Sequence, residues 1–345
     1  MKALCVGESS YAFNVLTQKI PVEGTENTFN EVIEGGTGSA CNVAYILGKF
    51  KNDSYLASTT GDDTFGNLLK KELERTGVHT EYMETAYDKR TSLNITFISQ
   101  TTKQKMVNTI SKEKLLMKKS DFQMNPDVIY VDGFDYGASL AALNKNMDKV
   151  TVIGAKNPNK EVYELCKYCK YILATAEFAQ WATGLRLDFD SPSTLVDVYS
   201  SLINKFVNKT IIITIGNRGC LYIKDNQIKV MPGLNVNLLD DSGSGDFFRG
   251  AFIHYLMQDN DIEKAITFAN IAAGLSCTKM GTRAAVPEIS EIMVYFNQKY
   301  GAVDNSAMGD SQAVQNSSPQ LSNPQPQMMQ QPTDSTGDNT ANSVK

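Results

Sequence analysis

The chain has 345 residues, which is enough for one large α/β domain or two small ones. Hydrophobic residues make up 42%, charged residues make up 21%, and the formal net charge is −5. This mildly acidic, globular composition disfavours nucleic-acid binding, and the lack of a long uninterrupted apolar stretch disfavours a membrane span. The N-terminal run MKALCVGESS has no apolar signal core or small-residue cleavage site, so we expect a cytoplasmic protein.

Residues 1–300 alternate between short apolar runs and helical patterns. Runs that are apolar at consecutive positions predict strands covered on both faces, as in parallel sheets. They lie at 2–6, 128–131, 150–153, 171–173 and 210–215. Helical stripes are formed by Phe65, Leu68, Leu69 and Leu73, and by Leu195, Val198, Leu202 and Phe206. This alternation predicts a doubly wound, mostly parallel α/β sheet with helices on both faces.

Three stretches break the alternation. Residues 12–35 and 87–108 are polar with a β-type alternation, and we expect them to form a small β-sheet lid over one edge of the main domain. Residues 301–345 contain no aromatic side chain and are rich in Gln, Asn, Ser and Pro. Such a segment buries too little apolar surface to fold, so we predict a disordered tail after the domain at 1–300.

Cysteine and histidine are too sparse for a zinc site. The six cysteines are scattered, and Cys166-Lys-Tyr-Cys169 is an isolated C-x-x-C pair. Zinc would need further ligands, but His79 and His254 are the only histidines. We interpret the cysteine pair as two reduced helix thiols and His254 as a packed helix residue.

A glycine-rich segment carries the strongest chemical signal. The run DDSGSGD at 240–246 precedes a long apolar stretch that predicts a buried helix. Gly243 and Gly245 flank Ser244 and permit close approach of a ligand, and the first amides of a helix have no intrahelical partners. The loop therefore predicts an anion hole for a phosphoryl group. Asp246 beside it could accept a proton from an attacking hydroxyl or merely cap the helix, and spacing alone leaves both roles open.

This segment resembles the C-terminal signature of the ribokinase-like (PfkB) carbohydrate kinase family, D-T-x-G-A-G-D. Other family signatures are resembled in the same order along the chain, at 21–24, 34–48, 61–66, 214–219, 269–273 and 281–287. The resemblance covers nearly all of residues 1–300. It implies ATP-dependent phosphorylation of a sugar or sugar-derivative hydroxyl, a requirement for Mg²⁺, and a homodimer formed through the lid.

The resemblance also implies roles for individual residues. Asp246 is expected to be the base, with the anion hole at Gly243, Ser244, Gly245 and Asp246 itself. The expected substrate-binding residues are Asn14, Gly35, Gly36, Gly38 and Asn42. The expected nucleotide-binding residues are Thr214, Gly216, Gly219 and Asn270. Glu177 is expected near the waters of Mg²⁺, and Asp240 is expected near a monovalent cation such as K⁺.

Several of these residues have simpler explanations. The glycines around Gly36 can be a plain turn, and Glu177 can be a carboxylate at a helix start. Asn270 needs a polar partner in its apolar helix, which adenine or a backbone group would supply. Asp62 and Asp63 are expected to be turn and cap residues.

The chain departs from the family pattern at positions that bear on the acceptor. Ala12 stands where the family has a substrate-binding aspartate. Ser39 stands in the asparagine position, with Asn42 one turn later, and Ala174 replaces the asparagine of the N-x-x-E element. Asp241 replaces a threonine near the monovalent-cation site. These departures leave the acceptor and the potassium dependence open.

Other functions remain as alternatives. A nucleoside kinase on the same scaffold is the first, and a non-catalytic sugar or nucleotide sensor, suggested by Ala12 and Ala174, is the second. A nicotinamide dehydrogenase is disfavoured because no G-x-G-x-x-G follows the first strand. A Walker-type ATPase is disfavoured because no G-x-x-x-x-G-K-[ST] occurs in the chain.

Overall fold

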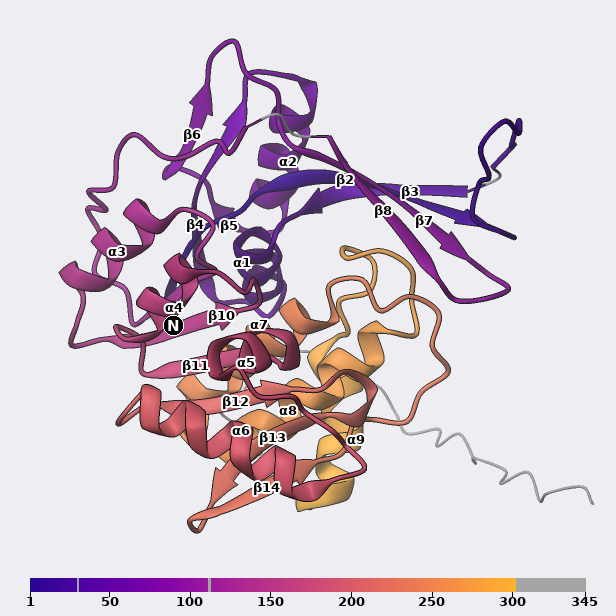
Figure 1. Ribbon diagram of the computed structural model, residues 1–345. Coiled ribbons are helices and arrows are strands. Elements are labelled where there is room, and N and C mark those ends of the chain that lie inside the picture. The colour runs from indigo at the N-terminus through magenta and orange to yellow at the C-terminus, as the bar shows by residue number, and fades with distance from the viewer. Residues whose placement is uncertain (30, 111–112, 302–345) are drawn as a thin grey trace, which may run out of the picture. The chain divides into compact units, whose positions relative to one another are not determined.

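A large, mostly parallel sheet runs through the part of the chain that the structure, a computed structural model, describes: residues 1–29, 31–110 and 113–301 (Figure 1). Within these residues its order is β14 (Gln227–Met231), β13 (Cys220–Lys224), β12 (Thr210–Thr214), β11 (Tyr171–Thr175), β10 (Val150–Ala155), β9 (Val128–Val131), β1 (Lys2–Val6), β4 (Asp53–Gly61) and β5 (Val78–His79), with β6 (Met83–Ala86) also paired to β4. All pairs are parallel except those that join β12, β13 and β14. The predicted tail lies outside the described residues from residue 302 onward.

Helices cover both faces of this sheet. One face is covered by α3 (Tyr136–Lys145), α4 (Lys160–Cys166), α5 (Ala176–Thr183) and α6 (Pro192–Lys205); the other is covered by α1 (Ser39–Lys49), α7 (Ser244–Asp259) and α8 (Ile262–Ser276), with α9 (Ile289–Tyr300) packed on α8. Leu4 and Val6 of β1 join the first core, whereas the alternating Ala3 and Cys5 are buried toward the second. The predicted doubly wound α/β sheet is confirmed, and burial on both faces explains why its strands are continuously apolar.

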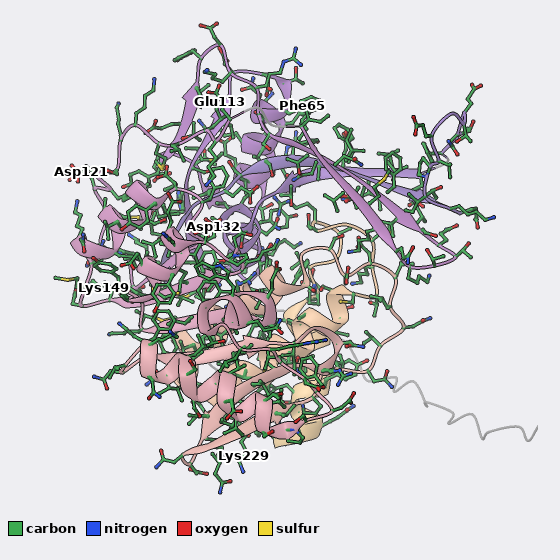
Figure 2. The ribbon with its side chains drawn as sticks, in the orientation of Figure 1. Phe65, Glu113, Asp121, Asp132, Lys149 and Lys229 are labelled. Carbon is green, nitrogen blue, oxygen red and sulfur yellow. The ribbon has the colours of Figure 1, made fainter. Side chains whose placement is uncertain are left out.

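A second, four-stranded sheet forms the predicted lid. Its order is β3 (Glu31–Thr37), β2 (Ser10–Thr17), β7 (Leu93–Ser99) and β8 (Lys105–Ile110). On one face, Tyr11 and Phe13 pack on Phe65 of α2 (Thr64–Arg75), which is labelled in Figure 2. Because alternate residues face opposite sides, the other face carries Asn14 and Lys105. We call this second face the cleft face of the lid.

The structure also bears on the predicted helix cap at Asp63, on the cysteine pair, and on metal clusters and membrane-spanning helices. Asp63 caps α2, accepting a hydrogen bond from the Gly66 amide at 2.8 Å. Only Cys166 of the C-x-x-C pair belongs to a helix, because α4 ends there and Cys169 lies in the following turn; both thiols are free and buried. Among the described residues, no cluster of His, Cys, Asp or Glu is placed to hold a metal ion by itself. None of the helices described has the length and apolarity to cross a membrane.

An aromatic cluster joins α7, α8 and α9. Phe268 of α8 is fully buried and contacts the rings of Tyr255 and Phe296 at centroid distances of 5.1 and 6.2 Å. His254 packs between Phe50 and Phe268, as predicted for a core residue. Burial lowers the pKa of His254 to about 4, so the imidazole is neutral at physiological pH. These rings attach the helix that begins at the glycine-rich loop to its neighbours.

Truncating the centre of this cluster should destabilise the domain. Phe268→Ala removes a fully buried ring, and we expect the free energy of unfolding to fall by about 3–5 kcal/mol. Urea unfolding followed by circular dichroism measures the change. The control is Val294→Ala on α9, whose side chain is 58% exposed and should change stability by less than about 0.5 kcal/mol. A loss below about 1 kcal/mol for Phe268→Ala would contradict this packing.

Candidate active site

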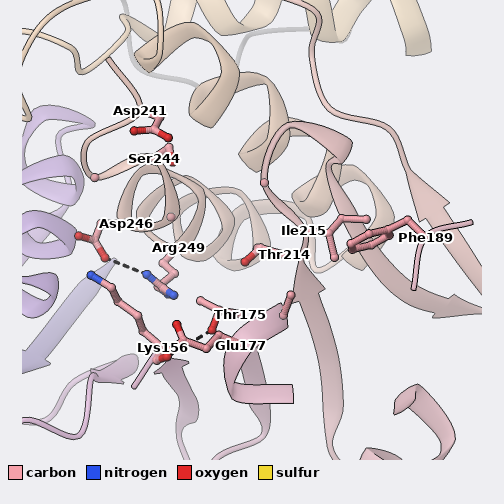
Figure 3. Close-up of a pocket in the computed structure, with 14 residues that line it drawn as sticks. Lys156, Thr175, Glu177, Phe189, Thr214, Ile215, Asp241, Ser244, Asp246 and Arg249 are labelled. Atoms are coloured by element: carbon pink, nitrogen blue, oxygen red, sulfur yellow. Dashed lines mark hydrogen bonds and ion pairs between the residues drawn. The ribbon is translucent and has the colours of Figure 1, made fainter. Parts of the chain in front are cut away.

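A pocket of about 420 Å³ opens at the carboxyl ends of β10, β11 and β12 (Figure 3). The ends of these strands and the residues directly after them contribute Lys156, Thr175, Ala176, Glu177, Thr214, Ile215 and Gly216. Phe189 comes from the connection between α5 and α6. The start of α7 and the loop before it contribute Asp241, Gly243, Ser244, Gly245, Asp246 and Arg249. The carboxyl edge is the usual ligand-binding edge of an open α/β sheet, because the connecting loops converge there.

The start of α7 leaves backbone amides pointing into this pocket. Gly243 adopts a left-handed conformation with φ 76°, which disfavours residues that have a β-carbon. Ser244 N–H donates to the Asp241 carbonyl at 3.1 Å, and Asp246 N–H donates to the Gly243 carbonyl at 2.7 Å. The amides of Gly243 and Gly245 have no hydrogen-bond partner within the described residues. Of the four amides predicted to form the anion hole, those of Ser244 and Asp246 therefore have backbone acceptors, and only those of Gly243 and Gly245 are free to bind a ligand.

Asp246 is held by three side chains. Its Oδ1 accepts hydrogen bonds from Ser39 Oγ at 2.6 Å and from Arg249 Nη1 at 2.9 Å, and its Oδ2 accepts one from Asn42 Nδ2 at 2.8 Å. Ser39 Oγ is also 2.9 Å from the hydroxyl of Tyr130. Burial raises the pKa of Tyr130, so this phenol stays neutral and can donate to Ser39. Asp246 is thus oriented by donors from α1 and from its own helix.

Two positive side chains lie beside Asp246. Arg249 follows it by three residues in α7, so both side chains lie on one side of the helix. Arg249 is 2% exposed, and its Nε has no hydrogen-bond partner in the described part of the chain. Lys156 follows β10, and its amine end points toward Asp246 and Arg249 in Figure 3. Together with the amides of α7, these cations make the pocket complementary to a polyphosphate.

Asp132 links three segments of the chain near the pocket by accepting hydrogen bonds from their backbone amides. It follows β9 and accepts backbone hydrogen bonds from Glu8 at 2.9 Å, Ala40 at 3.0 Å and Phe134 at 2.8 Å (Figure 2). Burial raises the pKa of the Asp132 carboxyl. Burial and the neighbouring Asp132 charge also raise the pKa of Glu8 to about 7. Glu8 is therefore a carboxyl group that titrates near neutral pH close to the site.

Arg283 joins the inner end of the lid to α1 and α2. Its Nε donates to Glu72 Oε1 at 3.1 Å and its Nη1 donates to Asn42 Oδ1 at 3.0 Å. Its Nη2 lies 3.1 Å from the sulfur of Cys41. The Gly36 amide donates to Glu72 Oε2 at 2.8 Å, so β3 belongs to the same network. Gly36 and Asn42 are thus held in place by protein groups.

The predicted site residues separate into three groups. The first group lines the pocket: Gly243, Ser244, Gly245, Asp246, Thr214, Gly216 and Glu177. The second group lies on the lid side of Asp246, in β2, in β3, in α1 or directly before α1: Asn14, Gly35, Gly36, Gly38 and Asn42. The third group is not among the residues that line the pocket: Gly219, Asn270 and Asp240. Gly219 packs against the backbone at Met231. The Asn270 amide donates to the Pro232 carbonyl at 2.5 Å, which is the backbone partner considered as one alternative.

Sequence reasoning missed some residues around Asp246. Arg249 is the one charge within the apolar run after Asp246, and its spacing of three residues was a usable signal. Lys156 lies three residues after the predicted strand at 150–153, where ligand-binding residues often lie. Ser39 was marked only by its place in the family pattern, which did not indicate its contact with Asp246. Arg283 gave no such signal, because its contacts depend on the packing of distant segments.

The fold and this pocket define a class: a doubly wound kinase of small molecules, with a lid and a glycine-rich helix start that lines its pocket. Residues 1–289 match the profile of the pfkB family carbohydrate kinases. The chain therefore belongs to this family, and it is a carbohydrate kinase, an ATP-binding phosphotransferase with an alcohol acceptor.

Individual relatives agree with this assignment. The chain is 26% identical over 315 residues to a deoxyribokinase of Salmonella typhi, covering 86% of this chain and 99% of the relative. It is 26% identical over 309 residues to a ribokinase of Bacillus subtilis, covering 85% and 98%. The structure of an Arabidopsis thaliana ribokinase complexed with ribose and ATP superimposes with a TM-score of 0.69 at 15% identity, covering 86% of this chain and 98% of the other. This likeness confirms the fold, lid included.

The raised pKa of Glu8 predicts a pH-dependent stability. The folded protein keeps a proton on Glu8 up to about pH 7, whereas the unfolded chain releases it near its ordinary value of 4.5. Stability from this group is therefore complete below pH 4.5 and is lost as pH rises through 7. Glu8→Gln, which is always neutral, should be more stable than the native protein by about 1–3 kcal/mol at high pH and similar at low pH.

Urea unfolding above pH 7 and near pH 4.5 measures this difference. The control is Glu34→Gln, which neutralises an exposed carboxylate of the lid. An equal effect of Glu8→Gln at the two pH values would show that Glu8 is charged throughout.

Proposed function

We propose that the chain transfers the γ-phosphoryl group of ATP to a hydroxyl of a sugar or sugar derivative, with Asp246 as the general base. One observation carries this proposal: a buried, oriented carboxylate stands directly beside the unpartnered amides of Gly243 and Gly245. A proton acceptor and an anion hole in contact are what phosphoryl transfer to an alcohol requires.

The hydrogen bonds around Asp246 keep it ready to accept a proton. Ser39 and Asn42 both donate to its carboxylate, so they fix its direction. Asp246 takes the proton of the acceptor hydroxyl as that oxygen bonds to the γ-phosphorus. The bond between the γ-phosphorus and the bridging oxygen breaks, and ADP leaves.

Arg249, Lys156 and the two glycine amides balance the charge on the transferring group. Arg249 is buried and held by Asp246 before the nucleotide arrives, so it needs little reorganisation during the reaction. Glu177 at the start of α5 is the residue that would hold Mg²⁺ through water. A single carboxylate suits this ion, which would supply positive charge against the phosphates of the nucleotide.

The acceptor is expected to bind between Asp246 and the cleft face of the lid. The named activities of the relatives, on ribose and deoxyribose, favour a pentose or a derivative of one. On this face Asn14 can hydrogen-bond a hydroxyl, whereas Ala12 offers no such group. A panel of pentoses, deoxypentoses, hexoses and nucleosides with coupled ADP detection tests the assignment. Turnover of nucleosides alone would replace the sugar with a nucleoside as the acceptor.

Removing the charge of Asp246 should abolish turnover without unfolding the domain. Asp246→Asn keeps the shape but cannot accept the hydroxyl proton, so we expect kcat to fall at least about a thousandfold. Calorimetry should show affinity for a non-hydrolysable ATP analogue within about threefold of the native value. The control is Asp259→Asn at the far end of α7, which should leave kcat unchanged. Near-normal turnover by Asp246→Asn would refute the assigned base.

We further propose that two copies pair through the lid. The lid face opposite the cleft exposes the apolar residues Val32 and Ile110, 51% and 52% exposed, beside the half-buried Phe97 and Met106. An exposed apolar sheet face of this kind is suited to pack against a second copy.

A charge on this face should separate the copies. We expect Val32→Asp to convert a dimer into a monomer, as measured by sedimentation equilibrium. The matched control is Val107→Asp, which introduces the same charge on the cleft face, where it should leave the mass unchanged. A monomeric mass for the native protein would contradict the dimer.

A further inference from the structure

A lysine of the lid reaches the loop that precedes the anion hole. Lys105 is the first residue of β8, and its Nζ lies 2.9 Å from Ser242 Oγ and 3.2 Å from Asp240 Oδ1. It also forms an ion pair with Asp241. An ammonium group has three N–H donors, and here each meets one oxygen of the same loop.

Asp240 is the residue around which this loop is organised. Its side chain is 1% exposed. Its Oδ1 accepts from the Ser242 amide at 2.9 Å, and its Oδ2 accepts from the Gly281 amide at 3.0 Å. Burial alone would raise the pKa of Asp240, but these hydrogen bonds and the Lys105 charge together lower it. Asp240 is therefore a buried, ionised carboxylate three residues before Gly243.

Lys105 supplies the positive charge that this arrangement needs. Two adjacent carboxylates repel each other, and a buried carboxylate without a counter-ion is costly. Within the described residues, no other lysine or arginine lies at ion-pair distance from Asp240 or Asp241. Without Lys105, the loop would hold two unbalanced negative charges where the phosphates of a nucleotide must bind.

The lysine comes from the lid, far away in sequence. Lys105 pairs with Ile98 in the lid sheet and shares the cleft face with Asn14. In Figure 1 the lid lies over the loops around residues 240 and 281. The Lys105 contact is thus a direct link between the element that covers the acceptor and the loop that holds the phosphoryl group.

We propose that Lys105 is a tethered cation that holds the loop before α7 in its phosphate-binding shape, so that phosphoryl transfer needs no free monovalent metal ion. Potassium, which the family resemblance places near Asp240, does not fit beside an ammonium group that already contacts Asp240, Asp241 and Ser242. Lys105 is a positioning residue, and its role rests on the proposed function of the Gly243–Asp246 loop.

The test replaces the tethered cation by a free one. Activity and affinity for a non-hydrolysable ATP analogue are measured at constant ionic strength in tetramethylammonium, potassium or ammonium chloride. The native protein should change less than about twofold among these salts. Lys105→Ala should lose about 10- to 100-fold in kcat/KM and in analogue affinity in tetramethylammonium, and recover most of this in potassium or ammonium. Tetramethylammonium is too large to enter the vacated position.

The control is Lys103→Ala in the same hairpin, because Lys103 is exposed and makes no ion pair in the described part of the chain. It should behave like the native protein in all three salts. If Lys105→Ala does not fold, as judged by circular dichroism, Lys105→Gln keeps the chain length without the charge and takes its place.

Three outcomes would overturn the proposal: a native protein that itself requires potassium, a Lys105 variant without loss, or a loss that small cations do not restore. Failure of the proposed function is distinguishable. If the native protein transfers no phosphoryl group, but the variant loses analogue affinity and regains it in potassium, the tethered cation stands and the kinase mechanism falls.

Discussion

The buried ion pair between Asp246 and Arg249 is the interaction on which the rest of the site depends. A buried pair is costly unless further hydrogen bonds satisfy its atoms, and here Ser39 and Asn42 provide them from α1. Asp246, the start of α7 and the first turn of α1 are therefore joined in one network of contacts. A change in any member would displace the carboxylate relative to the amides of Gly243 and Gly245, and transfer rates are sensitive to shifts of that size.

The site also shows how an acidic protein accommodates a polyanion. The net charge of −5 is distributed over the whole chain, whereas Arg249 and Lys156 converge on one pocket with a helix N-terminus between them. A local field of this kind is strong because low-dielectric walls surround it. The carboxylates nearby are kept from opposing it, since Asp246 is paired with Arg249, Asp240 with Lys105, and the raised pKa of Glu8 reduces its charge near neutrality.

The structural features that could be predicted from the sequence are those formed by contiguous residues. Runs such as 2–6 and 128–131 indicate buried strands by themselves, and Gly243 to Asp246 form a single turn. The contacts of Arg283 with Asn42, and of Lys105 with Asp240, join residues that are more than 130 positions apart. Nothing in one sequence marks such pairs, because they arise only when the lid and the α7 loop are packed. The roles assigned to the individual site residues stay predictions, and among these residues Gly219 and Asn270 lie outside the pocket lining.

The Arg283 network has a mechanical consequence. Arg283 binds only as a donor, so the oxygen of the Asn42 amide must face it and the nitrogen must face Asp246. The same guanidinium, through Glu72 and Gly36, pins the inner end of β3 to two helices. Any movement of the lid relative to α7 would therefore have to leave the inner end of β3 in place and break the contacts of Lys105 at the start of β8.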